Sequence, residues 1–132
     1  MNYWKKGCNH LLKCDPVFEK YYNPKHQLKT NKNKFDVLFK SICSQQISVS
    51  AAMSIYKNSK HIIGPINFTN FTNNKKKIKK LPLSNNKKKC LISLLENYHL
   101  VSKIKSNENS FENVNKDLTQ IFGIGTVSYT HL

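Results

Sequence analysis

Apolar residues recur at helical spacing along most of this chain. The first stripe has i, i+4, i+7, i+8 spacing and consists of Trp4, Cys8, Leu11 and Leu12. It predicts a first helix that ends near Asp15-Pro16. Asp15 can cap a short second helix that carries Val17, Phe18 and Tyr21 and ends before Pro24. A polar stretch, roughly 25–34, then predicts a loop.

The clearest amphipathic stripe follows this loop and consists of Phe35, Leu38, Phe39 and Ile42. It predicts a helix that runs into the segment Ser-Gln-Gln-Ile-Ser at 44–48. Ser48 is expected to cap a further helix, whose inward face would be Ala51, Ala52, Ile55 and Tyr56. Gly64-Pro65 breaks that pattern.

The last part of the chain contains two lysine-rich stretches, 75–80 and 87–89, on either side of Leu-Pro-Leu at 81–83. Ser84 can cap a helix whose buried face is Leu91, Leu94, Leu95 and Tyr98. A last helix, which ends at Gly123, is marked by Val114, Leu118, Ile121 and Phe122. The sequence shows no alternating strand pattern of useful length and no solenoid repeat, so we expect an all-α fold.

Charge narrows the class of partner. The 132 residues include 22 basic side chains, all lysine, and 7 acidic ones, for a formal charge of +15. A genome poor in G and C would explain the excess of Lys and Asn, but a charge of this size attracts polyanions whatever its origin. Nucleic acid is therefore the leading partner. The length suits one domain, and no apolar run reaches the length of a membrane span. Residues 1–14 lack a continuous apolar region and a small-residue cleavage site, so we do not expect secretion.

The cysteines and histidines give no metal-binding pattern. There is no Cys-x-x-Cys pair, and His10, His61 and His99 have no ligand spacing. We interpret the four cysteines as reduced structural thiols: Cys8, Cys14, Cys43 and Cys90. No metal and no cofactor are expected.

The segment Leu-Thr-Gln-Ile-Phe-Gly-Ile-Gly at 118–125 reads as a helix, then Gly-hydrophobic-Gly, then the start of another helix. Two glycines this close allow a sharp turn and bring backbone N–H groups against an anion, and a following helix adds its N-terminal dipole. Gly123, Gly125 and the N–H of Thr126 are the predicted phosphate contacts. The alternative is an ordinary glycine cap between two helices.

A second segment strengthens the first interpretation. Residues 35–52 read Phe-x-x-Leu-Phe-x-Ser-Ile-Cys-Ser-Gln-Gln-Ile-Ser-Val-Ser-Ala-Ala, some seventy residues before the glycine turn. Together with the opening Trp4…Leu11…Asp15-Pro16-x-Phe18 and Leu83-Ser84-x-x-Lys87, this resembles the helix-hairpin-helix DNA glycosylase superfamily. Within it, the chain is most similar to the 3-methyladenine DNA glycosylase II branch.

The resemblance implies an all-α helical bundle that is incomplete at its C-terminus. The glycosylase domain would cover 1–126, with the hairpin at 118–126, and 127–132 would be an atypical tail. It also implies base excision repair: the enzyme flips an alkylated purine out of double-stranded DNA and hydrolyses its N-glycosidic bond. Val127 stands where strand-cutting branches have a lysine, which implies a monofunctional hydrolase. The catalytic aspartate would lie beyond Leu132, so we expect this chain to be an inactive fragment.

The resemblance also assigns roles to individual residues. Gln46 falls where the family places the side chain that fills the gap left by the flipped base, and Gln45 is a weaker candidate. Trp4 is interpreted as core rather than base pocket, and the lysine-rich stretches as solvated faces. We expect an intracellular monomer without membrane contact: cytoplasmic, nucleoid-associated if bacterial, and nuclear if eukaryotic. Two alternatives remain open: a non-catalytic helix-hairpin-helix DNA-binding module, and a lysine-rich helical domain with a coincidental Gly-Ile-Gly.

Overall fold

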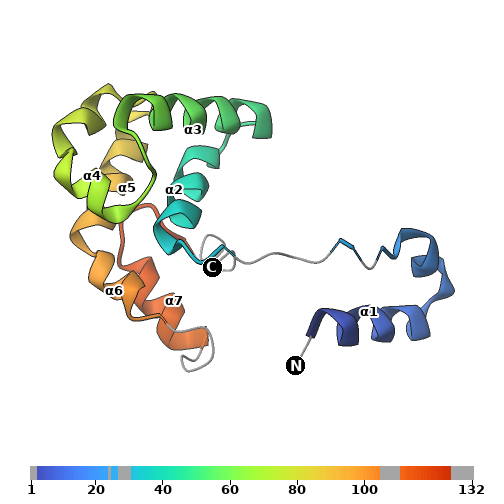
Figure 1. The fold of residues 1–132 in the computed structure, drawn as a ribbon. Helices are drawn as coiled ribbons and strands as arrows, with labels where there is room; N and C mark the ends of the chain where they lie inside the picture. Colours follow the sequence, from blue (N-terminus) through green and yellow to red (C-terminus); the bar gives the residue numbers. More distant parts are fainter. Residues whose placement is uncertain (1–2, 24, 27–30, 105–110, 126–132) are drawn as a thin grey trace. The chain divides into compact units, whose positions relative to one another are not determined.

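The computed structural model describes residues 3–23, 25–26, 31–104 and 111–125, and the regular elements within these ranges are all helical (Figure 1). The chain divides into two compact units, Met1–Thr30 and Asn31–Leu132. The expected all-α fold is confirmed for the described residues. No helix among them is long and apolar enough to span a membrane. Thr126 and the proposed tail at 127–132 lie outside these ranges.

The N-terminal unit consists of helix α1 (Tyr3–Cys14) and the 3-10 helix η1 (Pro16–Tyr21). Asp15 separates them and caps η1 as expected, because its Oδ1 accepts a hydrogen bond from the N–H of Val17 at 2.9 Å. Trp4, predicted as a core residue, is only half-buried. It lines a shallow apolar groove of this small unit rather than a closed interior.

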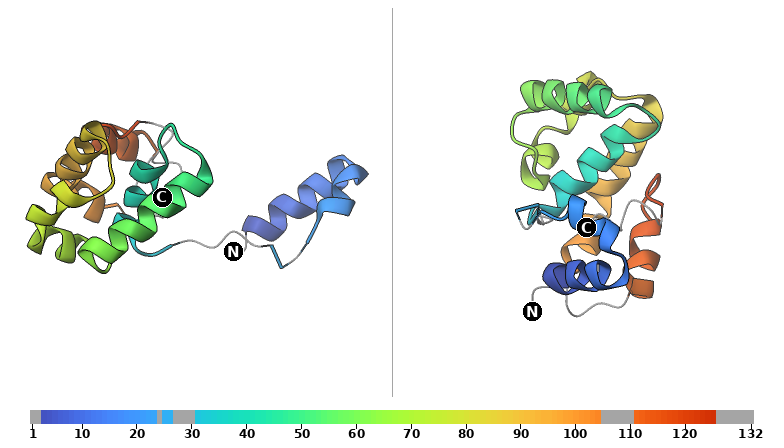
Figure 2. Two further views of the ribbon diagram at one scale, coloured as in Figure 1. Left: turned by 90° about the horizontal axis from the view of Figure 1, so that it is seen from above. Right: turned by 90° about the vertical axis from the view of Figure 1, so that its right-hand side faces the viewer.

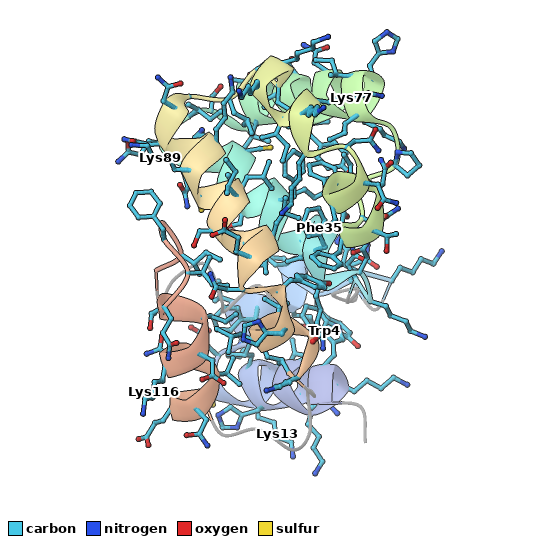
Figure 3. All side chains as sticks on the ribbon, turned by 90° about the vertical axis from the view of Figure 1, so that its left-hand side faces the viewer. Trp4, Lys13, Phe35, Lys77, Lys89 and Lys116 are labelled. Carbon is cyan, nitrogen blue, oxygen red and sulfur yellow. The ribbon has the colours of Figure 1, made fainter. Side chains whose placement is uncertain are left out.

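Helix α2 (Lys34–Ser44) is the centre of the larger unit. Its predicted stripe is fully inside, with Phe35, Leu38, Phe39 and Ile42 each at most 1% exposed. Asn33 caps the helix through a hydrogen bond from the N–H of Asp36. The rings of Phe35 and Phe39 each pack edge-to-face with Phe71, with ring centroids 5.0 and 5.1 Å apart. Figure 3 shows Phe35 among the packed side chains inside the unit.

Helix α3 (Val49–Ile63) begins at the predicted cap, where Ser48 Oγ accepts a hydrogen bond from the N–H of Ala51. The predicted inward face is partly wrong, because Ala51 is exposed and the fully buried positions are Ser59 and Ile63. The helix packs on α2, where Tyr56 donates a hydrogen bond to Asp36 and its ring meets that of Phe39. It stops at Gly64, whose φ of +91° no longer fits a helix.

Two short elements after Gly64 were not predicted. They are α4 (Phe68–Asn73), capped by Asn67, and the 3-10 helix η2 (Lys75–Lys80). Their sequences are mostly polar, and each element contributes only one fully buried side chain to the core, Phe71 in α4 and Ile78 in η2. A single apolar anchor in six residues gives no periodicity to read.

The last described elements are α5 (Asn85–Glu96), α6 (Tyr98–Ser102) and α7 (Phe111–Thr119). Ser84 caps α5 as predicted, but Tyr98 belongs to α6, because α5 already ends at Glu96. The last helix ends at Thr119 rather than at Gly123. Ile121 is buried all the same, in the turn that follows.

Within the larger unit, α2 and α5 lie side by side, with α3 at one end and α6 and α7 at the other (Figures 1 and 2). The two segments that carry the predicted site are the α2–α3 turn and the chain after α7. Both reach α5, which therefore determines how they meet.

Candidate DNA-binding site

The turn between α2 and α3 holds the two candidate glutamines in different environments. Gln46 has a φ of +58°, the only positive value among the described non-glycine residues, and its side chain is exposed. A residue with a Cβ adopts this backbone region at a cost, so the surrounding structure must impose it. Helix α2 ends at Ser44 and Ser48 already caps α3, which leaves three residues to reverse the chain. The tight connection thus presents Gln46 outward.

The Gly-Ile-Gly segment forms a compact turn after α7. The N–H of Ile121 bonds to the carbonyl of Leu118, and the N–H of Ile124 bonds to the carbonyl of Ile121, both at 3.1 Å. Ile121 and Ile124 are buried and anchor the turn, whereas Phe122, Gly123 and Gly125 are exposed. The alternation puts the isoleucines inward and leaves the glycine backbone accessible.

The two positions of this turn differ in whether the fold requires glycine there. Gly123 has a φ of +79°, and a Cβ there would come within 2.8 Å of the Cys90 sulfur, so the fold itself requires glycine. Gly125 has neither a positive φ nor a described atom within 4 Å of such a Cβ. Gly125 therefore does not need the left-handed backbone region. Nothing in the described protein requires glycine at that position.

A direct hydrogen bond joins the two predicted segments. The side-chain amide of Gln45 donates from Nε2 to the backbone carbonyl of Gly123 at 2.9 Å, across 78 positions of sequence. A second bond holds the glycine turn on α5, since the N–H of Phe122 donates to Ser93 Oγ at 3.1 Å. Gln45, the weaker candidate from the sequence, therefore positions the hairpin, and Gln46 stays exposed.

The first turn of α5 completes the site. Lys87 donates from Nζ to the carbonyl of Cys43 at 2.9 Å and so satisfies a carbonyl in the last turn of α2. Between these elements lies an open pocket of about 420 Å³. Its lining residues come from all three segments: Gln45, Gln46, Ser84, Asn86, Lys87, Cys90, Phe122 and Gly123.

The electrostatics of the pocket favour an anion and offer no nucleophile or base. Lys87 and the N-terminus of α5 supply positive charge, and none of the lining residues is acidic. Burial raises the pKa of the Cys90 thiol to about 11, and burial raises that of Cys43 to about 12 although Lys87 opposes the rise. Both thiols are therefore protonated and unreactive at neutral pH. Among the described residues, no group of three His, Cys, Asp or Glu side chains could hold a metal ion.

Asp36, the buried carboxylate among the described residues of the unit, lies outside this pocket, and its oxygens are engaged in hydrogen bonds. It accepts hydrogen bonds from Tyr56 Oη at 2.6 Å, from Asn31 Nδ2 at 2.7 Å and from Lys40 Nζ at 2.8 Å. Burial opposes its ionisation, but the bonds from Lys40, Tyr56 and Asn31 outweigh burial and keep the pKa of Asp36 below its usual value. Such a carboxylate supports the fold rather than acting on a substrate.

The structure brings together three of the predicted site residues, Gln45, Gln46 and Gly123, and places Gly125 two positions along the same turn. Thr126 lies outside the described residues. Lys87 and Phe122 line the pocket but were not predicted as site residues. The spacing Ser84-x-x-Lys87, which is part of the resemblance, could have identified Lys87 as a site residue. Phe122 could not be identified in this way, because its exposure depends on where α7 ends.

No family model and no curated protein match this sequence. A solved structure, a DNA-3-methyladenine glycosidase from Bacillus halodurans, is similar to the chain with a TM-score of 0.66 and 24% sequence identity. The match covers 80% of this chain and 51% of the glycosidase, so the chain spans about half the length of that protein. The two chains share a helical fold, which confirms the expected fold of the DNA glycosylase type.

Proposed function

We propose that this chain is the lesion-recognising part of a DNA glycosylase that removes alkylated purines from double-stranded DNA. The observation that carries the proposal is the hydrogen bond from Gln45 to the Gly123 carbonyl. It joins the two segments on which the resemblance rests, although they are far apart in sequence. The fold shared with a DNA-3-methyladenine glycosidase supports the same conclusion.

In this proposal the glycine turn binds the DNA backbone. Gly125 leaves open space around its Cα, so a phosphate can approach the peptide N–H groups closely. Such contacts fix the position of the duplex without reading its sequence. Gln46, exposed on a strained turn beside the same pocket, enters the base stack and occupies the space of the flipped nucleotide.

Hydrolysis needs a carboxylate to stabilise the cationic sugar, and none lines the described pocket. We therefore expect the 132-residue chain to bind and unstack DNA without releasing a base. The same observation favours the second candidate function, a non-catalytic DNA-binding module. The two differ in whether a flippable base is recognised.

The experiment is fluorescence anisotropy with three duplexes of one length: fully paired, mismatched and abasic. A glycosylase part should bind the mismatched and abasic duplexes at least about tenfold tighter, because the cost of unstacking, a few kcal/mol, is already reduced in them. Equal affinity for all three would favour the non-catalytic module. No binding at low salt would end both proposals.

The role of Gln46 is tested with Gln46→Gly and a duplex that carries 2-aminopurine at the target position. Glycine removes the side chain and accepts the positive φ, so the fold should be unaffected or slightly stabilised. The fluorescence rise on unstacking should be lost, and Gln46→Asn, with a shorter side chain that tolerates the same φ, should give an intermediate rise. An unchanged signal in the glycine variant would exclude Gln46 as the inserted side chain.

The role of Gly125 is tested with Gly125→Val, against Gly7→Val in α1 as a matched control. Neither new side chain meets a described protein atom within 4 Å at its Cβ, so both variants should fold. Only Gly125→Val should weaken DNA binding, because it blocks the approach of a phosphate to the turn. Equal affinity of both variants would support the simple glycine-cap interpretation.

A further inference from the structure

The lysines of η2 and of the first turns of α5 lie on two elements that a hydrogen bond from Lys88 to Lys79 joins, and together they are here called the lysine surface. Its members are Lys75, Lys76, Lys77, Lys79, Lys80, Lys88 and Lys89. All seven are exposed or half-buried. Figure 3 shows Lys77 and Lys89 toward the end of the unit that is remote from Lys116 on α7.

The lysine surface is built into the fold rather than carried on a loose segment. Ile78 and Leu81, each 2% exposed, anchor η2 in the core at the i, i+3 spacing of a 3-10 helix. The remaining positions of η2 must then point toward solvent, and all of them are lysine. Lys88 donates from Nζ to the carbonyl of Lys79 at 2.8 Å, which fastens η2 to α5.

This part of the chain has no opposing charge of its own. From residue 37 to residue 95 the sequence contains eleven lysines and no Asp or Glu: Lys40, Lys57, Lys60, Lys75, Lys76, Lys77, Lys79, Lys80, Lys87, Lys88 and Lys89. A genome poor in G and C would explain the number of lysines, but it would not explain why no acidic residue lies among them. The repulsion between neighbouring ammonium groups is relieved when a polyanion binds.

The lysine surface also continues into the candidate site. Lys88 and Lys89 follow Lys87, whose side chain lines the pocket, and α5 begins at Asn85, only five residues after η2 ends. At about 2 Å per residue, η2 extends over about 10 Å, which corresponds to about three base-pair steps of DNA.

We propose that the lysine surface binds the phosphate backbone of the duplex beside the lesion, at phosphates that the glycine turn does not reach. It thereby lengthens the DNA footprint and orients the duplex across the pocket. This inference rests on the proposed function, because it takes duplex DNA in the pocket as given.

The test compares two triple variants that remove equal charge. Lys75→Gln, Lys76→Gln and Lys77→Gln neutralise part of the lysine surface. Lys32→Gln, Lys103→Gln and Lys116→Gln form the control, since all six side chains are exposed and belong to the same unit. Circular dichroism verifies that each variant folds, and affinity for a duplex of about 20 bp, two helical turns, is measured across a salt series.

If three phosphate contacts are lost, the slope of log K against log salt should fall by about 2.7 in the first variant. A fourfold rise in salt would then weaken wild-type binding about 40-fold more than it weakens binding by this variant. The control should keep a slope near that of the wild type. On a duplex of about 10 bp, one helical turn centred on the lesion, the two variants should differ less, because fewer flanking phosphates are present.

Equal slopes for the two variants on the longer duplex would overturn this inference and leave the proposed function standing. A wild-type chain whose DNA binding is absent or insensitive to salt would instead refute the proposed function. The two failures are therefore distinguishable in one data set.

Discussion

The aromatic core and the candidate pocket lie at opposite ends of α2, and each is held together by a different kind of interaction. At the N-terminal end of the helix, Phe35 and Phe39 pack with Phe71 and are fully buried. At its C-terminal end, the chain is held by single hydrogen bonds between side chains and distant backbone groups, such as Gln45 to Gly123 and Lys87 to Cys43. Burial of apolar area dominates in the first region and directional bonds in the second.

The difference shows where this protein tolerates backbone strain and side chains without a described protein partner. In the core even the charged group is matched, since Asp36 receives hydrogen bonds from three side chains. In the pocket Gln46 keeps a strained φ and an exposed side chain, and Phe122 stays 55% exposed. Unsatisfied groups and strain of this kind are typical of sites that bind a ligand.

The largest effect should come from the same substitution made in the two regions. Phe35→Ala should lower the free energy of unfolding by about 3–5 kcal/mol, because it leaves a cavity between Phe39 and Phe71. Phe122→Ala should change it by less than about 0.5 kcal/mol, because the ring is mostly exposed. Urea denaturation of both variants measures the contrast. Similar losses would show that the pocket contributes to the core after all.

The next effect separates fold from binding within the glycine turn. Gly123→Ala should destabilise by about 1–3 kcal/mol, from the positive φ and from the contact of its Cβ with the Cys90 sulfur. Gly125→Ala, with open space at its Cβ, should leave the melting temperature unchanged. Adding Cys90→Ala to Gly123→Ala should restore the part that is due to crowding by the Cys90 sulfur, after correction for Cys90→Ala alone. Strict additivity in this double-mutant cycle would show that the two sites do not touch.

A third experiment uses pH to examine the polar group of the core. The pKa of Asp36 is lowered in the folded state, so its ionised form contributes stability above the ordinary value of 3.8. That contribution is lost as the pH falls through the lowered folded-state pKa. The stability difference between wild type and Asp36→Asn should therefore be largest at neutral pH and should shrink below about pH 4.

Thermal melts of both proteins between pH 7 and pH 2.5, about one unit below the free-acid value, follow this difference. Tyr56→Phe removes one of the three hydrogen bonds to Asp36 and should shift the acid-induced loss to higher pH. A pH-independent difference between wild type and Asp36→Asn would contradict the stabilising role of the charge.

The smallest effect on stability is expected at the contact that joins the two site segments. Gln45→Ala should cost about 0.5–1.5 kcal/mol, the usual contribution of one hydrogen bond. Hydrogen exchange at Gly123 and Ile124 should nevertheless speed up, because the turn loses its link to α2. Gln120→Ala, at an exposed glutamine just after α7, is the control and should leave the exchange of both amides unchanged.

Much of the fold could be predicted because its signals are local. Asp15, Ser48 and Ser84 each bond to a backbone N–H two or three residues later, so the sequence alone locates these helix starts. The stripe on α2 repeats every three or four residues and is wholly buried. Element ends were less predictable. Helix α7 stops at Thr119, and the apolar residues that follow, Ile121 and Ile124, are buried in the turn around Gly123. This turn is held on α5 by the bond from Phe122 to Ser93.

The candidate site divides in the same way. The spacing of the two glycines predicted a turn from the residues themselves, and the resemblance to the glycosylase superfamily singled out Gln45 and Gln46. Tertiary structure alone decided that Gln45 reaches Gly123 across 78 positions and that Lys87 reaches Cys43 across 44. It also decided that Gly123, against Cys90, is required by the fold whereas Gly125 is not. Caps and periodicity act within a few residues along the chain, but contacts of this kind exist only once packing has brought distant segments together.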